Sequence, residues 1–149
     1  MLCYCKSGDS YSDCCEPIIK EEKSASDFEQ LMRSRYSAFA IGNTSYLINT
    51  SSDRLLTTFS EQDLIETCST CQFVHLDVVD FKDDTVEFIA HLLINDEYHK
   101  IHERSTFIND NNKLKYDTGL LFETPIIKLK RNDNCPCQSG KKYKKCHMD

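Results

Sequence analysis

The apolar positions change their spacing about halfway along the chain, from a helical period to the period of β-strands. In the first half, a helix is predicted after Ser26-Asp27-Phe28-Glu29, because the Ser-x-x-Glu pattern of a capping box satisfies free backbone N–H groups at a helix start. Gly42 is a typical C-cap for the end of this helix. Shorter helices are predicted from about residue 44 to 48 and, behind Ser60, over residues 61–67.

From Gln72 onward, the sequence is rich in Val, Ile, Phe, Tyr and Leu, in the manner of strands. Turn-forming triplets such as Lys82-Asp83-Asp84 separate the segments. Such short gaps imply antiparallel neighbours, since parallel strands need long crossovers. Strands are predicted over residues 73–81, 85–94, 98–108 and 113–122. The order of the elements therefore predicts an α+β fold, with helices packed on one face of a four-stranded antiparallel sheet.

Length and composition suit one globular domain with small appendages. The chain has 149 residues, of which 40% are hydrophobic and 10% aromatic. No apolar stretch approaches the ~20 residues that span a bilayer, and no signal-peptide core is present near the N-terminus. We therefore expect a cytoplasmic protein, in which thiols stay reduced and clustered cysteines bind metal more often than they form disulfides.

The charge is unevenly distributed, with an acidic head and a basic tail. The formal net charge is −6, which argues against bulk electrostatic attraction to nucleic acid. Residues 1–30 hold three lysines against seven acidic residues, whereas residues 128–147 hold seven basic residues against Asp133 alone. The two ends could attract each other, bind separate partners or simply be solvated surfaces.

Two sets of metal-ligand residues with the same spacing lie at the two ends of the chain. The N-terminal set has the form C-x-C-x8-C-C and comprises Cys3, Cys5, Cys14 and Cys15. The C-terminal set has the form C-x-C-x8-C-H and comprises Cys135, Cys137, Cys146 and His147. Four sulfur or imidazole ligands suit a tetrahedral Zn²⁺, and a closed set of four indicates a structural site. We predict two zinc ions; disulfides or free thiols are the alternatives, which a reducing compartment disfavours.

Each set lies in a short segment, here called the N-terminal clip (residues 1–17) and the C-terminal clip (residues 131–149). Segments so small bury too little apolar surface to fold alone, so metal binding supplies the missing free energy. Residues 18–26 are polar and charged and are predicted to be a linker. We expect metal removal to unfold both clips and to leave the central domain, residues 18–130, folded.

Four segments of the chain resemble a known family. NCPCQSGKKYKKCH (residues 134–147) resembles the SEC-C motif, the zinc-binding tail of the SecA translocation ATPase, and CYCKSGDSYSDCC (residues 3–15) resembles a second copy. LMRSRYSAF (residues 31–39) and HERS (residues 102–105) resemble the YchJ-like bacterial proteins. The resemblance implies two zinc sites that flank a nuclear-transport-factor-two-like, or cystatin-like, cone, with helices on a strongly curved antiparallel sheet.

Three positions depart from the usual motif. Tyr4 and Lys6 stand where the first motif usually has Pro and Gly, and Gln138 stands where the second has Gly. If position 6 or 138 needs a positive φ, the non-glycine residue there costs roughly 1 kcal/mol. All ligand positions are retained, so we expect both sites to bind, with the N-terminal site the weaker.

The third predicted strand carries a run of polar residues that face opposite sides of the sheet, with Glu103 and Ser105 on one side. A curved sheet under helices encloses a cavity, in which charged groups could act as acid and base. We favour a structural alternative, in which Glu103 pairs with an arginine of the first helix. The candidates for a pocket or an ion pair are Arg33, Arg35, Tyr36, Glu103 and Arg104, and none is assigned as catalytic.

Cys68 and Cys71 form an isolated C-x-x-C at the end of the third predicted helix. The pair could be redox-active or bind a further metal, but no second pair is available to complete a tetrahedral site. Chance spacing of half-buried cysteines is the simpler interpretation. His91 and His99 are likewise interpreted as ordinary strand residues.

The basic residues of the C-terminal clip form a candidate docking surface. This surface comprises Lys141, Lys142, Tyr143, Lys144 and Lys145. An aromatic residue between lysines suits contact with RNA, and a small basic face beside zinc equally suits an acidic protein.

Three functions are consistent with these features. The one we favour is a non-enzymatic zinc-binding adaptor, whose partners by analogy with the SecA tail would be ribosome, chaperone or protein-translocation components. The second is an enzyme or small-molecule binder that uses the cavity of the cone. The third is an RNA-binding module that uses the basic tail, with an affinity that falls steeply with salt.

Overall fold

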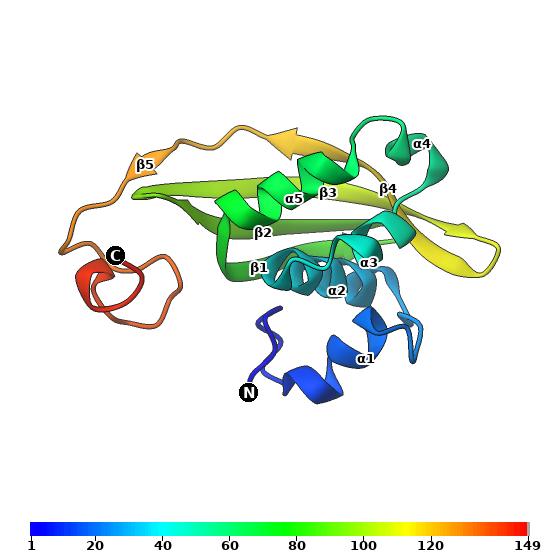
Figure 1. Cartoon of the computed structure of the whole chain (residues 1–149), viewed down its shortest axis with the longest axis horizontal. Coiled ribbons are helices and arrows are strands. Elements are labelled where there is room, and N and C mark those ends of the chain that lie inside the picture. Colours follow the sequence, from blue (N-terminus) through cyan, green and yellow to red (C-terminus); the bar gives the residue numbers. More distant parts are fainter. Residues whose placement is uncertain (149) are drawn as a thin grey trace.

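The computed structural model describes residues 1–148, so Asp149 of the predicted C-terminal clip lies outside the described residues. The helices are α1 (Glu16–Ile19), α2 (Phe28–Ile41), α3 (Thr44–Asn49), α4 (Asp53–Leu56) and α5 (Glu61–Thr70), and 3-10 turns η1 (Tyr11–Asp13) and η2 (Tyr143–Lys145) lie in the clips. The strands are β1 (Gln72–Lys82), β2 (Thr85–Ile94), β3 (Glu97–Asp110), β4 (Lys113–Phe122) and β5 (Ile127–Lys128) (Figure 1). No helix in this part of the chain is long and apolar enough to cross a membrane.

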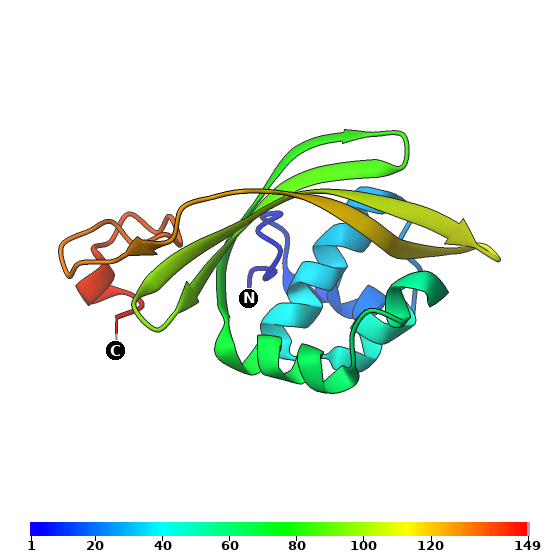
Figure 2. The ribbon, with the colours of Figure 1, turned by 90° about the horizontal axis from the view of Figure 1, so that it is seen from above.

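Strands β1 to β4 form an antiparallel sheet in sequence order, which confirms the predicted α+β fold. Register shifts in the β1–β2 and β3–β4 pairs mark bulges or irregularities, which bend a sheet and increase its twist. The sheet arches over the helices, which lie on its concave side (Figure 2). The short strand β5 was not predicted, and it pairs with the start of β3, beyond the end of β4.

The helix termini follow the sequence signals with one correction. Asp27, and not Ser26, is the N-cap of α2, because its carboxylate accepts a hydrogen bond from the backbone N–H of Gln30 at 2.7 Å. The N–H of Ser26 instead donates to the side chain of Gln30 at 2.6 Å. Gly42 is the predicted C-cap, with φ of 79°, a conformation that glycine adopts without strain. Ser60 caps α5 in a reciprocal capping box with Asp63.

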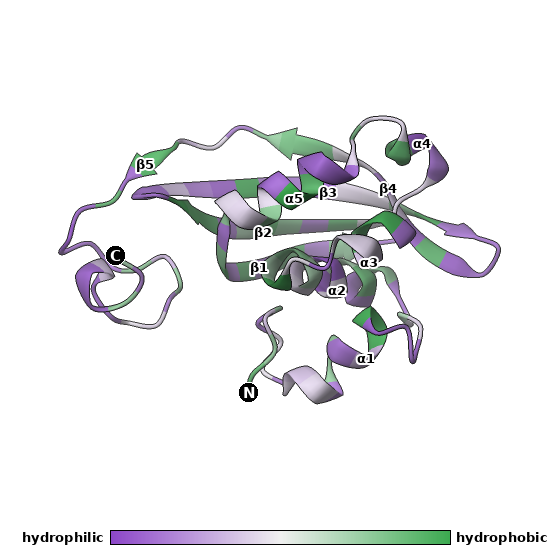
Figure 3. Cartoon of the chain, in the orientation of Figure 1, coloured by the Kyte–Doolittle hydropathy of each residue, from purple (hydrophilic) through white to green (hydrophobic). Residues whose placement is uncertain are grey.

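The main core lies between α2 and the concave face of the sheet. Apolar and polar residues alternate along the strands (Figure 3), and β1, β2 and β3 contribute buried residues to the core. Leu31 of α2, Leu47 of α3, Val86 of β2 and Phe107 of β3 are fully buried there. The prediction of a linker over residues 18–26 is wrong at its start, because Ile18 and Ile19 belong to α1 and to this core.

The segment between α3 and α4 covers part of the β4 edge. The N–H of Tyr116 donates to the carbonyl of Thr50 at 2.7 Å, and the N–H of Ser52 donates to the carbonyl of Tyr116 at 2.9 Å. These bonds satisfy backbone groups that would otherwise be free at a sheet edge. They also fix Tyr116 against the helical layer.

Two candidate metal centres

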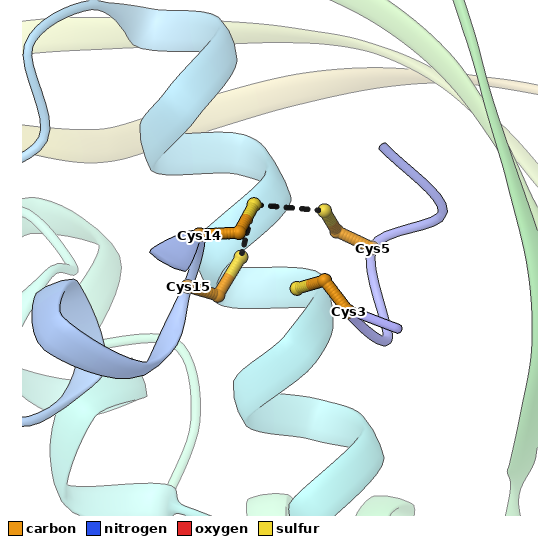
Figure 4. A group of neighbouring side chains, drawn as sticks. All are labelled: Cys3, Cys5, Cys14 and Cys15. Carbon is orange, nitrogen blue, oxygen red and sulfur yellow. Dashed lines mark hydrogen bonds between the residues drawn. The ribbon is translucent and has the colours of Figure 1, made fainter. Parts of the chain in front are cut away.

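The four cysteines of the N-terminal clip converge on one point (Figure 4). Their sulfur atoms all lie within 4.8 Å of one another. Cys5 Sγ lies 3.7 Å from Cys14 Sγ, which lies 3.9 Å from Cys15 Sγ. Sulfurs bound tetrahedrally to one zinc-sized ion at about 2.3 Å would be about 3.8 Å apart. The Cys5–Cys14 and Cys14–Cys15 distances therefore match those expected for ligands of one tetrahedral metal ion.

The C-terminal set converges in the same way, with ligand atoms within 4.8 Å of one another. Cys137 Sγ lies 3.5 Å from Cys146 Sγ, and His147 Nδ1 lies 3.1 Å from Cys135 Sγ and 3.2 Å from Cys146 Sγ. A nitrogen and a sulfur on one tetrahedral ion would be about 3.5 Å apart, because metal–nitrogen bonds are shorter than metal–sulfur bonds. Nδ1 is thus the imidazole atom in position to coordinate.

The two clips repeat one backbone conformation. Cys3 N–H donates to the carbonyl of Asp9 at 2.8 Å, and Cys135 N–H donates to the carbonyl of Lys141 at 3.0 Å. In both clips a serine hydroxyl reaches the third ligand: Ser7 Oγ lies 3.3 Å from Cys14 Sγ. The equivalent distance from Ser139 Oγ to Cys146 Sγ is 3.5 Å.

Two residues of this shared backbone are in the left-handed region without being glycine. Lys6 has φ of 64° and Gln138 has φ of 63°, at the two positions where the motif usually has Gly. Such a conformation costs a residue with a Cβ roughly 1 kcal/mol. Each clip therefore holds a small amount of backbone strain, which ligand binding must outweigh.

The surroundings of the two clips differ. Cys3, Cys5 and Cys15 are 2%, 0% and 1% exposed, and they belong to the main core beneath α2. From α2, Arg33 Nη1 donates to the carbonyl of Cys5 at 2.8 Å, and Ser37 Oγ lies 3.7 Å from Cys3 Sγ. These helix residues support the ligands from behind, as outer-shell groups do in metal sites.

The C-terminal clip belongs to a separate small cluster on the outer face of the sheet. Val74, Leu93, Cys135 and Tyr143 form its buried centre, with Tyr98 and Leu129 packed against it. The hydroxyl of Tyr143 donates to Asp96 in the β2–β3 turn at 2.7 Å. The clip lies at one end of the molecule, beyond this hairpin (Figures 1 and 2).

The thiols of each set influence one another. The hydrogen bond with Cys15 lowers the pKa of Cys5 and raises the pKa of Cys15. Burial raises the pKa of Cys14 to about 11. Burial also raises the pKa of Cys135 to about 12, and it lowers the pKa of His147, which favours the neutral imidazole that can bind a metal.

The candidate docking surface is only partly as predicted. Lys141, Lys142, Lys144 and Lys145 are exposed. Tyr143 is buried between the clip and the hairpin, so it cannot present its ring to a partner. The alternation of one aromatic with lysines suggested a surface residue, but its ring is needed to attach the clip to the sheet.

The predicted ion pair between Glu103 and an arginine of the first long helix does not form. Within residues 1–148, Arg33 pairs with Glu29 at 3.0 Å, and Arg104 pairs with Glu87 at 2.9 Å on the outer face of the sheet. Arg35 is buried and donates to the carbonyl of Leu47 at 2.9 Å. The carboxylate of Glu103 instead accepts hydrogen bonds from the hydroxyls of Ser105 and Tyr116.

The outer face of the sheet also carries a polar network that the sequence analysis missed. His91 is buried, and its ring lies between Asp77 Oδ2 at 2.8 Å and the Tyr98 hydroxyl at 2.5 Å. His75 also contacts Asp77, at 3.1 Å. The signal was available, because His75 and Asp77 alternate along one strand and His91 lies opposite His75 in the next.

Cys68 and Cys71 are half-buried at the end of α5. Burial raises the pKa of both thiols, which disfavours the thiolate that redox and metal chemistry need. Neither belongs to a metal-ligating group among the described residues.

The fold and the two ligand sets define a class of protein: an α+β cone with a metal-ligating clip at each end. Residues 27–119 match the family described as YchJ, middle NTF2-like domain, and residues 131–149 match the SEC-C motif. The chain belongs to the YchJ family.

Its relatives are similar over nearly their whole length. A UPF0225 protein from Vibrio cholerae is 37% identical over 153 residues, which cover 98% of this chain and 99% of that protein. A UPF0225 protein from Photorhabdus laumondii is 37% identical over 157 residues, which cover 97% of each.

Two solved structures of SEC-C motif containing proteins are similar in fold. The solution structure from Rhodopseudomonas palustris has a TM-score of 0.75 and 31% identity, and the match covers 83% of this chain and all of that chain. The crystal structure from Psychrobacter arcticus has a TM-score of 0.63 and 24% identity, and the match covers 95% of this chain and 87% of that chain.

Proposed function

We propose that this chain is a cytoplasmic zinc-binding adaptor, in which two structural zinc ions shape the clips and the C-terminal clip docks an acidic protein. Thiolate and imidazole ligands support zinc over harder cations such as Mg²⁺ and Ca²⁺, which prefer oxygen. Each set offers four protein ligands whose coordinating atoms lie within 4.8 Å of one another, and a complete set of four leaves no position for a substrate. Zinc would therefore stabilise the clips and would not catalyse a reaction.

The observation that carries the docking function is the placement of the basic clip surface, defined as Lys141, Lys142, Lys144 and Lys145. All four residues are exposed, and the clip that holds them is anchored on the β2–β3 hairpin. The metal clip and the hairpin together hold the backbone that carries these lysines in one conformation. Binding of a partner therefore costs little backbone entropy. Preorganised positive charge is suited to a face rich in carboxylates.

An acidic protein fits this surface better than RNA does. Because Tyr143 is buried, the clip lacks the exposed aromatic ring on which single-stranded bases would stack. The chain carries a formal net charge of −6, and seven thiolates with two Zn²⁺ would make it more negative still. A long polyanion such as RNA would extend beyond the clip and be repelled by the negative charge of the rest of the chain. A small acidic face on a protein would contact the clip alone. By analogy with the SecA tail, the partner would be a chaperone, ribosomal or protein-translocation component.

The metal content can be tested by native mass spectrometry of the untagged protein, purified without chelator. We expect two zinc ions in the wild type and one in each of the single variants Cys5→Ser and Cys137→Ser. A wild-type protein that carries no zinc would contradict the structural role of both clips. If the wild type carries one zinc, the proposal holds only for the clip in which the Cys→Ser substitution removes that zinc.

The docking function can be tested by affinity capture with the wild type and with the variant Lys144→Glu/Lys145→Glu. Binding of each captured partner, once purified, is then measured for both proteins. Lys82→Glu/Lys113→Glu is the matched control, because these exposed lysines lie at hairpins on the other end of the sheet. We expect the clip variant to bind the partner at least about tenfold more weakly at unchanged zinc content, and the control to bind normally. An equal loss of affinity in both variants would contradict the assignment of docking to the basic clip surface. Capture that ribonuclease abolishes would favour the RNA-binding alternative.

A further inference from the structure

A cavity of about 220 Å³ lies between α2 and the concave face of the sheet. Its walls are mainly apolar and strongly aromatic, and they are formed by Met32, Phe39, Phe73, Phe88, Ile101 and Phe107. Several lining residues, among them Phe39 and Ile101, are only half-buried. An apolar, aromatic-lined hollow with a few polar groups is the usual form of a small-molecule site.

One polar group in this wall has no partner. Tyr36 is 5% exposed and lines the cavity, and its hydroxyl is buried without a hydrogen-bond partner within residues 1–148. Its ring is held in place by an edge-to-face contact with Phe73, with ring centroids 5.6 Å apart. A tyrosine hydroxyl is protonated at neutral pH, so it can donate a hydrogen bond. A buried hydroxyl without a partner is unfavourable, and such groups are rare in folded proteins.

The remaining polar groups of the wall are already paired and balance in charge. Glu103 accepts from the hydroxyls of Ser105 and Tyr116, and the guanidinium of Arg35 lies 4.9 Å from the centre of the Tyr116 ring. Gly119 makes this arrangement possible, because a Cβ there would lie 2.5 Å from the Glu103 carboxylate. One positive and one negative group thus border the cavity, and a charged ligand would gain no net attraction.

The volume limits the size of an occupant. In another protein, an apolar cavity of about 150 Å³ binds benzene. A cavity of about 220 Å³ has room for one six-membered ring with a small substituent. The four phenylalanine side chains favour a flat aromatic ring over a branched aliphatic group.

We propose that this cavity binds a neutral, single-ring aromatic molecule that carries one hydroxyl or carbonyl oxygen, and that the Tyr36 hydroxyl forms the hydrogen bond to that oxygen. The site is independent of the adaptor function, because none of its lining residues belongs to either clip. The ring fills the apolar walls, and the oxygen pairs the one buried hydroxyl that the fold leaves free among the described residues.

The test uses the zinc-loaded full chain and three probes that share a methyl-substituted benzene ring: p-cresol, toluene and 4-methylbenzoate. We expect p-cresol to bind about three- to tenfold more tightly than toluene, since one hydrogen bond separates them, and 4-methylbenzoate to bind more weakly than p-cresol. Ala90→Leu, which fills the cavity from β2, should abolish binding of all three. The proposal fails if the wild type does not bind p-cresol, or if Ala90→Leu binds it equally well.

Tyr36→Phe tests the assigned hydrogen bond, with Tyr46→Phe as the matched control. Tyr46 is equally buried, but its hydroxyl lies 2.6 Å from Ser34 Oγ and it does not line this cavity. Tyr36→Phe should bring the p-cresol and toluene affinities to about the same value without lowering the melting temperature of the free protein. Tyr46→Phe should lower the melting temperature and leave the preference for p-cresol intact. An unchanged preference in Tyr36→Phe, or a melting temperature lowered as far as in Tyr46→Phe, would overturn the assignment.

Discussion

The two clips share a backbone and a ligand spacing, yet they have different places in the molecule. In the N-terminal clip, Cys3, Cys5 and Cys15 are part of the main core and contact α2. The C-terminal clip packs in a small separate cluster against the β2–β3 hairpin. The ligand spacing therefore sets the geometry of a metal-binding loop, whereas the packing around the loop sets how much the metal contributes to the stability of the whole domain.

The charges on the equivalent surfaces are also opposite. Asp9 and Asp13 occupy the positions of the N-terminal clip that correspond to Lys141 and Lys145 in the C-terminal clip. The N-terminal clip therefore presents carboxylates beside its metal ligands, and the C-terminal clip presents ammonium groups. One duplicated scaffold has become a core element at one end and a charged, accessible surface at the other.

The largest expected difference between the clips is the effect of losing a ligand. Cys5→Ser should remove one metal and lower the free energy of unfolding of the whole domain by at least about 3 kcal/mol, because the sulfur site is continuous with the core. Cys137→Ser should remove one metal and change the main unfolding transition by less than about 1 kcal/mol, because its cluster is separate. Urea unfolding of both variants, with zinc counted in each, measures this difference.

This prediction revises the expectation that metal removal unfolds both ends and spares the centre. Equal losses of stability in the two variants would contradict the distinction between a core clip and an attached clip. Cys68→Ser is a suitable control, because Cys68 is a half-buried cysteine outside both ligand sets.

A smaller effect is expected at the two strained positions, Lys6 and Gln138. Replacement by glycine relieves the left-handed conformation, partly offset by the greater freedom of the unfolded chain. Lys6→Gly should raise the free energy of global unfolding by up to about 1 kcal/mol. Gln138→Gly should relieve the same strain but slow hydrogen exchange only within the C-terminal clip. A global gain from Gln138→Gly of the same size would show that the two clips are equally coupled to the core.

The smallest effect concerns pH and the sheet face beside the C-terminal clip. Burial lowers the pKa of His91 below its ordinary value of 6.5, against the opposing influence of Asp77. The folded protein therefore favours neutral His91, and its contribution to stability is complete above about pH 6.5 and is lost as the pH falls through the lower folded pKa. We expect the free energy of unfolding to decrease from pH 7 to pH 5, and to decrease less in His91→Gln.

The control for this measurement is His99→Gln, since His99 lies on β3 with a partly exposed side chain. A pH dependence that is the same in wild type and His91→Gln would assign the effect to another group. Asp77 is the next candidate, because hydrogen bonds from His91 and His75 outweigh burial and lower the pKa of its carboxyl.

Much of the fold could be predicted because its signals are local. The strands were placed within three residues of their observed ends, since their alternation and turn triplets are read within a few positions. The errors occurred where local signals are short or ambiguous. Adjacent Ser26 and Asp27 are both good caps, α1 and α4 are single turns, and β5 has two residues that gain their pairing from a distant strand.

The ligand sets could likewise be recognised from the chain alone, because each clip closes on itself. The bonds that shape it, such as Cys3 N–H to Asp9 and Cys135 N–H to Lys141, join residues within one short loop. The spacing of the cysteines therefore contains the geometry of the metal site.

Which clip is buried, which lysines are presented and where the cavity lies depend on contacts between distant residues. Arg33 reaches Cys5 and Tyr143 reaches Asp96 only when elements far apart in the sequence are assembled. The sequence shows the polar groups that need partners, but several partners of similar chemistry compete for each one. The packing of α2 against the sheet selects among them, and it leaves the buried Tyr36 hydroxyl without a hydrogen-bond partner among the described residues.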